Sequence, residues 1–95
     1  AIAGGVKLKA GVYAGTGTDE WTIHAGFPPK ALIIQDTDVI AFMAYGATRG
    51  HAIKDGTPYS YDLTWTETGV DLSSVGNSYN HLNSKFGTYQ YVILG

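Results

Sequence analysis

The sequence has no cysteine, few charged residues and no long hydrophobic run, and each absence excludes a class of protein. Without cysteine, neither a disulfide framework nor a thiolate metal site can form. Charged residues make up 15% of the chain and hydrophobic residues 44%, a balance too apolar for a disordered segment. No apolar run approaches the roughly 20 residues of a membrane-spanning helix, so we expect a folded domain with no membrane insertion.

Positive charge is also scarce. The net charge is −2, and the six basic residues are scattered along the chain. A protein that binds a phosphate backbone needs a basic stripe or patch. We therefore expect no nucleic-acid partner.

The length and the residue pattern indicate one small β-domain. The 95 residues suit a single domain, residues 1–95, with one modest core. No window keeps the i, i+3, i+4, i+7 pattern of an amphipathic helix. Short segments rich in Thr, Tyr, Val and Ile, broken by Gly and Pro, predict about seven or eight strands in an antiparallel β-sandwich or jelly-roll-like domain. The chain begins at Ala1 rather than Met, so we expect it to be processed or part of a longer protein.

Alternation of apolar and polar residues assigns faces to several strands. A first strand is predicted where every second residue is apolar, at Val6, Leu8, Ala10 and Val12. This apolar set is expected to face inward. The segment YSYDLTW, residues 59–65, predicts a half-buried strand. The polar segment of residues 66–87 predicts irregular structure with turns.

A small loop of sequence GTGT, residues 15–18, is rich in backbone N–H groups and raises the question of phosphate binding. A dinucleotide-binding loop has three spaced glycines leading into a helix, and a P-loop ends in Gly-Lys-Ser/Thr. This loop leads into Asp19 and Glu20, whose carboxylates repel an anion, and then into a strand. We predict a hairpin turn.

The polar residues form no strong metal or catalytic motif. The three histidines lie too far apart in sequence for the close pair of a helix-borne zinc site. Asp36 and Asp38 flank a tight turn and could bind Ca²⁺, but Asp in a turn more often bonds its own backbone. No Gly-x-Ser-x-Gly elbow and no cysteine nucleophile is present. We expect no metal, no cofactor and no enzymatic activity.

The aromatic content, 7 Tyr and 2 Trp, suggests sugar binding, because flat rings beside amide side chains can hold a sugar. Tyr59, Tyr61 and Trp65 share one strand face and are expected in the core. Other aromatic, amide and imidazole side chains gather in the polar segment. These side chains, together with Tyr45 earlier in the chain, are the predicted ligand-binding residues. The full set is Tyr79, Asn80, His81, Asn77, Asn83 and Tyr45. The alternative is ordinary loop chemistry.

Three segments, residues 32–34, 39–45 and 91–94, are apolar on both alternating faces. A strand of a two-layer sandwich has one inner face, so a second apolar face requires a cover from a partner. We therefore expect a homo-oligomer, with a trimer as the first choice. The predicted interface residues are Ile34, Ile40, Phe42, Tyr91 and Ile93.

Three stretches carry a resemblance to a known group of proteins: GVYAGTGTD at residues 11–19, WTIHAGFPPKALII at residues 21–34 and LNSKFGTYQYVILG at residues 82–95. Together they resemble small β-domains of bacteriophage and prophage structural proteins, usually terminal modules of tail-associated or fibre proteins. The matching positions are architectural, so no functional residue follows from them. The resemblance implies a location at the virion surface.

Two functions are then expected. The first is an adhesion module of a tail fibre or tail tip that binds a host cell-surface carbohydrate. The second is a structural decoration or capping domain of a capsid or tail, which joins other virion proteins and binds no cell. Loops in the unmatched middle, near residues 49–58 and 75–85, are where receptor specificity is expected.

Overall fold

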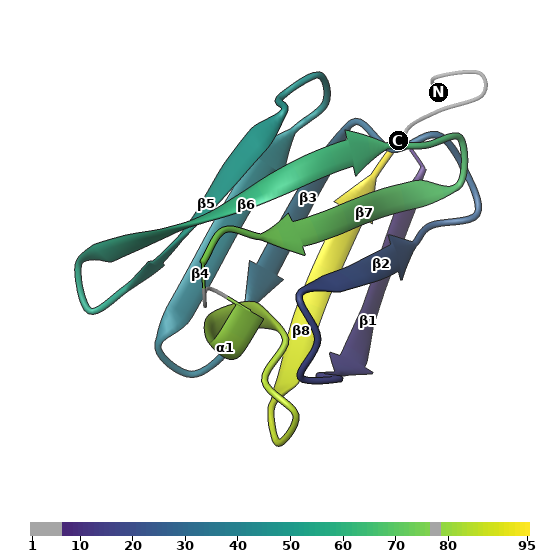
Figure 1. The fold of residues 1–95 in the computed structure, drawn as a ribbon. Helices are drawn as coiled ribbons and strands as arrows, with labels where there is room; N and C mark the ends of the chain where they lie inside the picture. The colour runs from purple at the N-terminus through teal and green to yellow at the C-terminus, as the bar shows by residue number, and fades with distance from the viewer. Residues whose placement is uncertain (1–6, 77–78) are drawn as a thin grey trace.

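The computed structural model describes residues 7–76 and 79–95, which form one curled antiparallel sheet and a single helical turn (Figure 1). The elements in chain order are β1 (Leu8–Ala14), β2 (Glu20–His24), β3 (Ala31–Gln35), β4 (Val39–Ala44), β5 (Arg49–Lys54), β6 (Thr57–Trp65), β7 (Gly69–Ser74), α1 (Tyr79–Leu82) and β8 (Thr88–Leu94). The prediction of an all-β antiparallel fold with seven or eight short strands is confirmed.

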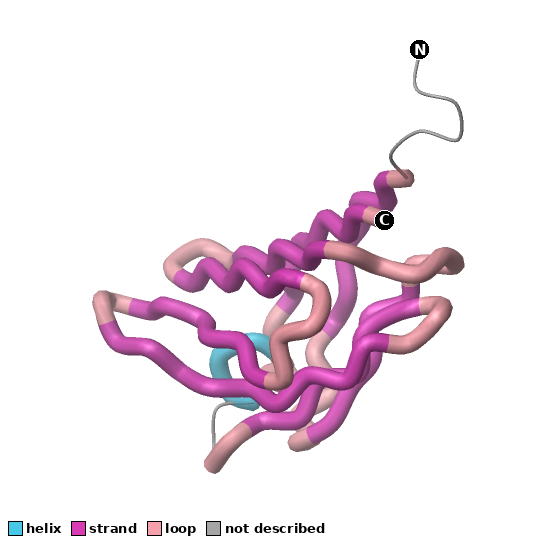
Figure 2. Tube along the Cα trace, turned by 90° about the horizontal axis from the view of Figure 1, so that it is seen from above, coloured by secondary structure: helices cyan, strands magenta, loops and turns pink. Residues whose placement is uncertain are grey.

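The strand order is β1-β8-β3-β4-β5-β6-β7-β2, so every strand belongs to one continuous hydrogen-bonded sheet. Seen from above, this sheet curls round on itself (Figure 2). The curled sheet takes the place of the two separate sheets of a sandwich. The core lies inside the curl.

β1 and β2 follow one another in the chain but form the two opposite edges of the sheet. β1 pairs with β8, and β2 pairs with β7. The predicted hairpin at residues 15–18 is therefore wrong, because the strands on either side of the loop do not pair with each other. Residues 15–19, here named the edge loop, cross from one edge of the sheet to the other.

Tight turns connect two pairs of neighbouring strands as hairpins. Between β5 and β6, Asp55 and Gly56 have φ values of 51° and 77°. Positive φ at both central residues is the requirement of a two-residue type I′ turn, and Asp-Gly is a preferred sequence for it. Between β3 and β4, the N–H of Asp36 donates to the carbonyl of Val39 at 3.0 Å and closes the second hairpin.

The polar segment of residues 66–87 is more regular than predicted. It contains β7, whose Val70 and Leu72 are buried on either side of the exposed Asp71. Two apolar positions are too few to separate a strand from a loop by periodicity alone. It also contains α1, which lies at one end of the curled sheet and within its outline from above (Figures 1 and 2). In the described residues, no helix has the length and apolarity needed to cross a membrane.

The inner face of the sheet carries the core. Leu82 of α1 is buried with it and closes one end of the curl. The fully buried large side chains from the strands include Leu32, Ile34, Met43, Tyr61, Val70, Leu72, Tyr89 and Ile93.

β1 faces the opposite way from the prediction. Leu8 and Val12 are 63% and 61% exposed, whereas Tyr13 turns inward. The Tyr13 ring stacks on Tyr89 at 5.2 Å between centroids, and its hydroxyl donates to the Leu82 carbonyl at 2.6 Å. The predicted inward set was wrong because both faces of this strand hold apolar side chains, and the larger aromatic ring takes the core. Val6 lies outside the described residues.

Three core tyrosines give a prediction about alkaline stability. Burial raises the pKa values of Tyr13, Tyr61 and Tyr89 above their usual value of about 10. Below that pH both the folded and the unfolded chain keep these phenols protonated. Above it the unfolded chain ionises first, so the free energy of unfolding should fall as pH rises.

The measurement is a titration of tyrosinate absorbance alongside circular dichroism. We expect three of the 7 tyrosines to ionise only as the β-sheet signal is lost. Ionisation of all seven with the sheet signal intact would contradict the burial of these rings.

Candidate functional site

The residues predicted to bind a ligand do not form one surface. Asn77 lies outside the described residues, and Tyr79 and Asn80 make the first half of α1. Tyr45 is exposed after β4, and its ring makes an edge contact with Trp65 at 5.7 Å between centroids. That turn lies at the end of β4 away from α1 (Figure 1), so Tyr45 is separated from the rest of the predicted set.

His81 is half-buried against Tyr59, with 3.8 Å between the ring centroids. Burial lowers the pKa of His81, and the positive charge of Lys54 acts in the same direction. A neutral imidazole packed on a tyrosine ring suits a contact that attaches α1 to β6.

Asn83 is 1% exposed and its amide is fully engaged. Its Oδ1 accepts from the N–H of Thr16 at 3.0 Å. Its Nδ2 donates to Thr16 Oγ1 at 2.7 Å and to the Thr18 carbonyl at 3.1 Å. The predicted ligand-binding role of Asn83 is wrong, because the side chain is buried and both its oxygen and its nitrogen are bonded within the chain.

Asn83 instead fixes the edge loop. Its carbonyl accepts from the N–H of Gly17 at 2.8 Å, so side chain and backbone hold the loop together. A Cβ at Gly15 would collide with the carbonyl oxygen of Ser84, so only glycine fits this close approach. The backbone N–H groups of Gly15, Thr16 and Gly17, which suggested a phosphate site, are therefore bonded to the segment after α1.

The main unpartnered feature of the described surface is an apolar patch on the outside of the sheet. The register places Ala10, Val92, Ile33 and Phe42 in one row across β1, β8, β3 and β4. Phe42 is 62% exposed. We name this surface the apolar outer face, and its members are Leu8, Ala10, Val12, Ile33, Ile40, Phe42 and Val92, with Ile53 of β5 beside it.

The apolar outer face carries no charge. In the described strands β1, β8, β3 and β4, every outward position holds an uncharged residue. A hollow of about 490 Å³ lies in the face, lined by Ala10, Val12, Ile33 and Val92 and bordered by the amides of Gln35 and Gln90. A charge-free, exposed apolar patch of this kind is typical of an interaction surface.

The structure places the five predicted interface residues on different sides of the sheet. Ile40 and Phe42 lie on the apolar outer face. Ile34 and Ile93 are fully buried in the chain's own core, so their assignment to an interface is wrong. Tyr91 is half-buried on the inner side, where its ring lies against Gly11. Consecutive residues of a strand point to opposite faces, and the sequence alone does not tell which face is covered.

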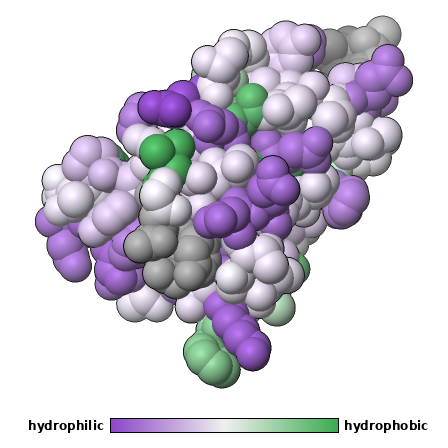
Figure 3. Space-filling model, in the orientation of Figure 1, coloured by the Kyte–Doolittle hydropathy of each residue, from purple (hydrophilic) through white to green (hydrophobic). Residues whose placement is uncertain are grey.

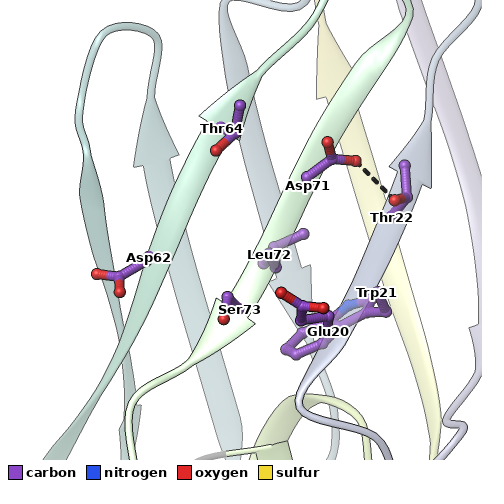
Figure 4. Close-up of a pocket in the computed structure, with 8 residues that line it drawn as sticks. All are labelled: Glu20, Trp21, Thr22, Asp62, Thr64, Asp71, Leu72 and Ser73. Atoms are coloured by element: carbon purple, nitrogen blue, oxygen red, sulfur yellow. Dashed lines mark hydrogen bonds between the residues drawn. The ribbon is translucent and has the colours of Figure 1, made fainter.

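The other half of the outer surface is polar. Figure 3 looks onto β6, β7 and β2, where hydrophilic side chains predominate. A shallow depression of about 410 Å³ lies there between carboxylate and hydroxyl groups (Figure 4). Thr22 donates to Asp71 at 2.6 Å, and Arg49 donates to Asp62 at 3.0 Å at the border. The depression offers hydrogen-bonding groups, and the Trp21 ring turns away from it toward Tyr61.

The structure offers no assembled centre for metal chemistry in the residues it describes, since no group of three or more His, Asp or Glu side chains comes together there. The turn considered for Ca²⁺ has Asp38 3.9 Å from the Lys54 ammonium. Comparison of the chain with models of protein families, with curated proteins and with solved structures gives no match.

The role of Asn83 gives a testable prediction. Asn83→Ala removes hydrogen bonds at a buried site. The N–H of Thr16 and the carbonyl of Thr18 each lose the hydrogen bond that the Asn83 side chain makes with them. We expect the free energy of unfolding to fall by about 3 kcal/mol, measured by urea denaturation.

The matched control is Gln35→Ala, which removes another bonded amide. Its Nε2 donates to Gln90 Oε1 at 2.8 Å, but on the exposed outer surface. We expect a loss under about 0.5 kcal/mol, as for most surface substitutions. Equal effects of the two substitutions would contradict the assigned role of Asn83.

Proposed function

We propose that this protein is a non-catalytic assembly module of a phage-type particle, and that its apolar outer face packs against a neighbouring copy of the chain. The observation that carries the proposal is the charge-free patch across four adjacent strands. The notable exposed side chains in it are Leu8, Val12, Ile40 and Phe42.

The energetics favour a covered face. Burying an exposed Leu, Val or Phe side chain contributes roughly 1.5–3 kcal/mol, and an interface of several such residues offsets the cost of association. Four strands of this length present a surface of roughly 20 Å on each side, from strand spacing and rise. That is about 400 Å² on each copy and about 800 Å² in total, the size of the small, weak interfaces below about 1,200 Å² rather than of the standard ones.

We propose a phage-type particle because three stretches of the chain resemble terminal modules of phage structural proteins. These stretches are residues 11–19, 21–34 and 82–95. In a symmetric homo-oligomer, one face of each subunit meets another subunit. A homo-oligomer at the virion surface, in contact with other virion proteins, is consistent with both the resemblance and the apolar outer face. The expected trimer stays a prediction about the number of copies.

Adhesion to a cell-surface carbohydrate is the second candidate. The polar depression on β6, β7 and β2 favours it, because its carboxylates and hydroxyls are groups that bond sugar hydroxyls. Sugar binding usually adds a flat aromatic platform, and the ring at this depression faces the core. We therefore place assembly first. Imaging of intact particles separates the two: a lattice on a capsid or tail favours assembly, and a distal tip favours adhesion.

The assembly proposal predicts the effect of a charge on the apolar outer face. Phe42→Asp puts a carboxylate on the apolar outer face, where covering it would remove its hydration. At micromolar concentration, light scattering with size-exclusion chromatography should show an oligomer for the unaltered chain and a lower-order species for Phe42→Asp.

Phe86→Asp is the matched control, because Phe86 is 92% exposed but lies in the segment after α1, off the apolar outer face. We expect it to leave the oligomer intact. Circular dichroism of both variants reports whether the sheet is retained. A monomer for the unaltered chain, or equal loss of the oligomer in both folded variants, would overturn the proposal.

A further inference from the structure

The two edge strands of the sheet differ in whether their outward N–H and C=O groups are hydrogen-bonded. In an antiparallel pair, alternate residues of a strand bond to the neighbouring strand and the others point away. Lys7 exchanges two hydrogen bonds with Gly95, and Gly15 donates to Gly87. The register between these points makes residues 9, 11 and 13 the ones that bond to β8. Leu8, Ala10 and Val12 therefore point their N–H and C=O groups to the open edge.

The β2 edge is partly covered by its own chain. In β2, the residues between those bonded to β7 are Glu20, Thr22 and His24. The hydroxyl of Thr18 donates to the Glu20 carbonyl at 2.8 Å, and Lys9 Nζ donates to the His24 carbonyl at 3.1 Å. No comparable side-chain bond to the outward groups of β1 occurs in the described residues.

Natural sheets usually protect an edge strand with Pro, a bulge, a short length or several charges. β1 is 7 residues long, has no Pro, and pairs with β8 without interruption. Lys9 is its one charged residue. An open edge of this kind is a template for an added strand.

We infer that β1 pairs antiparallel with β1 of a second copy about a two-fold axis at Ala10. Ala10 then lies opposite Ala10 of the partner subunit, and Leu8 lies opposite Val12 of the partner subunit. The three resulting pairs exchange about six backbone hydrogen bonds, because each hydrogen-bonded antiparallel pair contributes two. The contact is self-complementary, as a two-fold interface requires.

Charge and backbone use exclude two of the neighbouring registers, those with the axis at Leu8 or at Val12. An axis at Leu8 would place Lys7 opposite Lys9 of the partner subunit, and like charges directly opposite are destabilising. An axis at Val12 would place Leu8 opposite Thr16 of the partner subunit, whose N–H is already bonded to Asn83. With the axis at Ala10, Lys9 meets the partner's Gly11, so no lysines oppose each other.

The pairing also extends the apolar outer face. Leu8, Ala10 and Val12 have side chains on that face and backbone groups at the open edge. Joining two β1 strands therefore makes one continuous apolar surface from the faces of two copies. This inference builds on the proposed assembly function, but it uses a different contact from the packing of one face on another.

Single cysteines test the register, because the natural chain has none to compete. Ala10→Cys places two thiols at the axis, where paired Cα atoms lie about 5.5 Å apart, within the range that a disulfide spans. Ala14→Cys is the matched control: it is exposed on the same face of the same strand but lies beyond the paired residues. Under mild oxidation we expect the Ala10→Cys chain to form linked dimer at least about tenfold faster than Ala14→Cys, a difference of about 1.4 kcal/mol in barrier.

A second pair of variants does not depend on thiol chemistry. Ala10→Lys puts like charges against each other at the axis, whereas Ala14→Lys adds the same charge outside it. We expect loss of the two-fold contact only in Ala10→Lys, measured by light scattering. Equal cross-linking of the two cysteine variants, or equal association of the two lysine variants, would overturn the β1 pairing.

Combining substitutions separates this inference from the proposed function. In the double variant Phe42→Asp, Ala10→Cys, we expect the linked dimer to form as fast as in Ala10→Cys alone, because Phe42 lies three strands from β1. Loss of cross-linking in the double variant would contradict an independent edge contact. If Phe42→Asp leaves the oligomer unchanged while Ala10→Cys cross-links, the face packing fails and the β1 pairing stands.

Discussion

A β-sheet has two faces, and the part of this chain that the structure describes covers one of them. The strands curl so that their inner side chains bury one another, and α1, a single turn, closes one end. No layer of helices or second sheet in the described residues lies over the outside of β1, β8, β3 and β4. Because the outward side chains there are apolar and uncharged, that surface gains free energy from any cover that excludes water. The proposed assembly function follows from this constraint.

The same curl creates the second open feature, the pair of edges. A sheet that curls without closing leaves one strand at each end, and the edge loop must bridge them. A loop of small residues at this point has backbone groups that need partners, and the buried amide of Asn83 supplies them. The loop in turn supplies Thr18, whose hydroxyl occupies the Glu20 carbonyl at the β2 edge. Stability of the loop and protection of that edge thus depend on one side chain.

The sequence was sufficient for features that depend on short spacing and insufficient for those that depend on distant pairing. Alternation and turn residues predicted the all-β class with seven or eight short strands. The inner or outer side of β1 depends on whether Tyr13 or Leu8 packs better against β8, which the strand itself does not encode. The pairing of β1 with β8 joins residues 74 to 86 positions apart, and the contact of Asn83 with Thr16 joins residues 67 positions apart. No local pattern in the sequence predicts contacts over such distances.

The central claim is that the apolar outer face is covered when copies of the chain meet. Hydroxyl-radical footprinting read by mass spectrometry measures it directly, by comparing the labelling of Phe42 and Phe86, both exposed in a single copy. The account predicts that labelling of Phe42 falls as protein concentration rises through the association range, while labelling of Phe86 stays constant. Constant labelling of Phe42 across that range would contradict it.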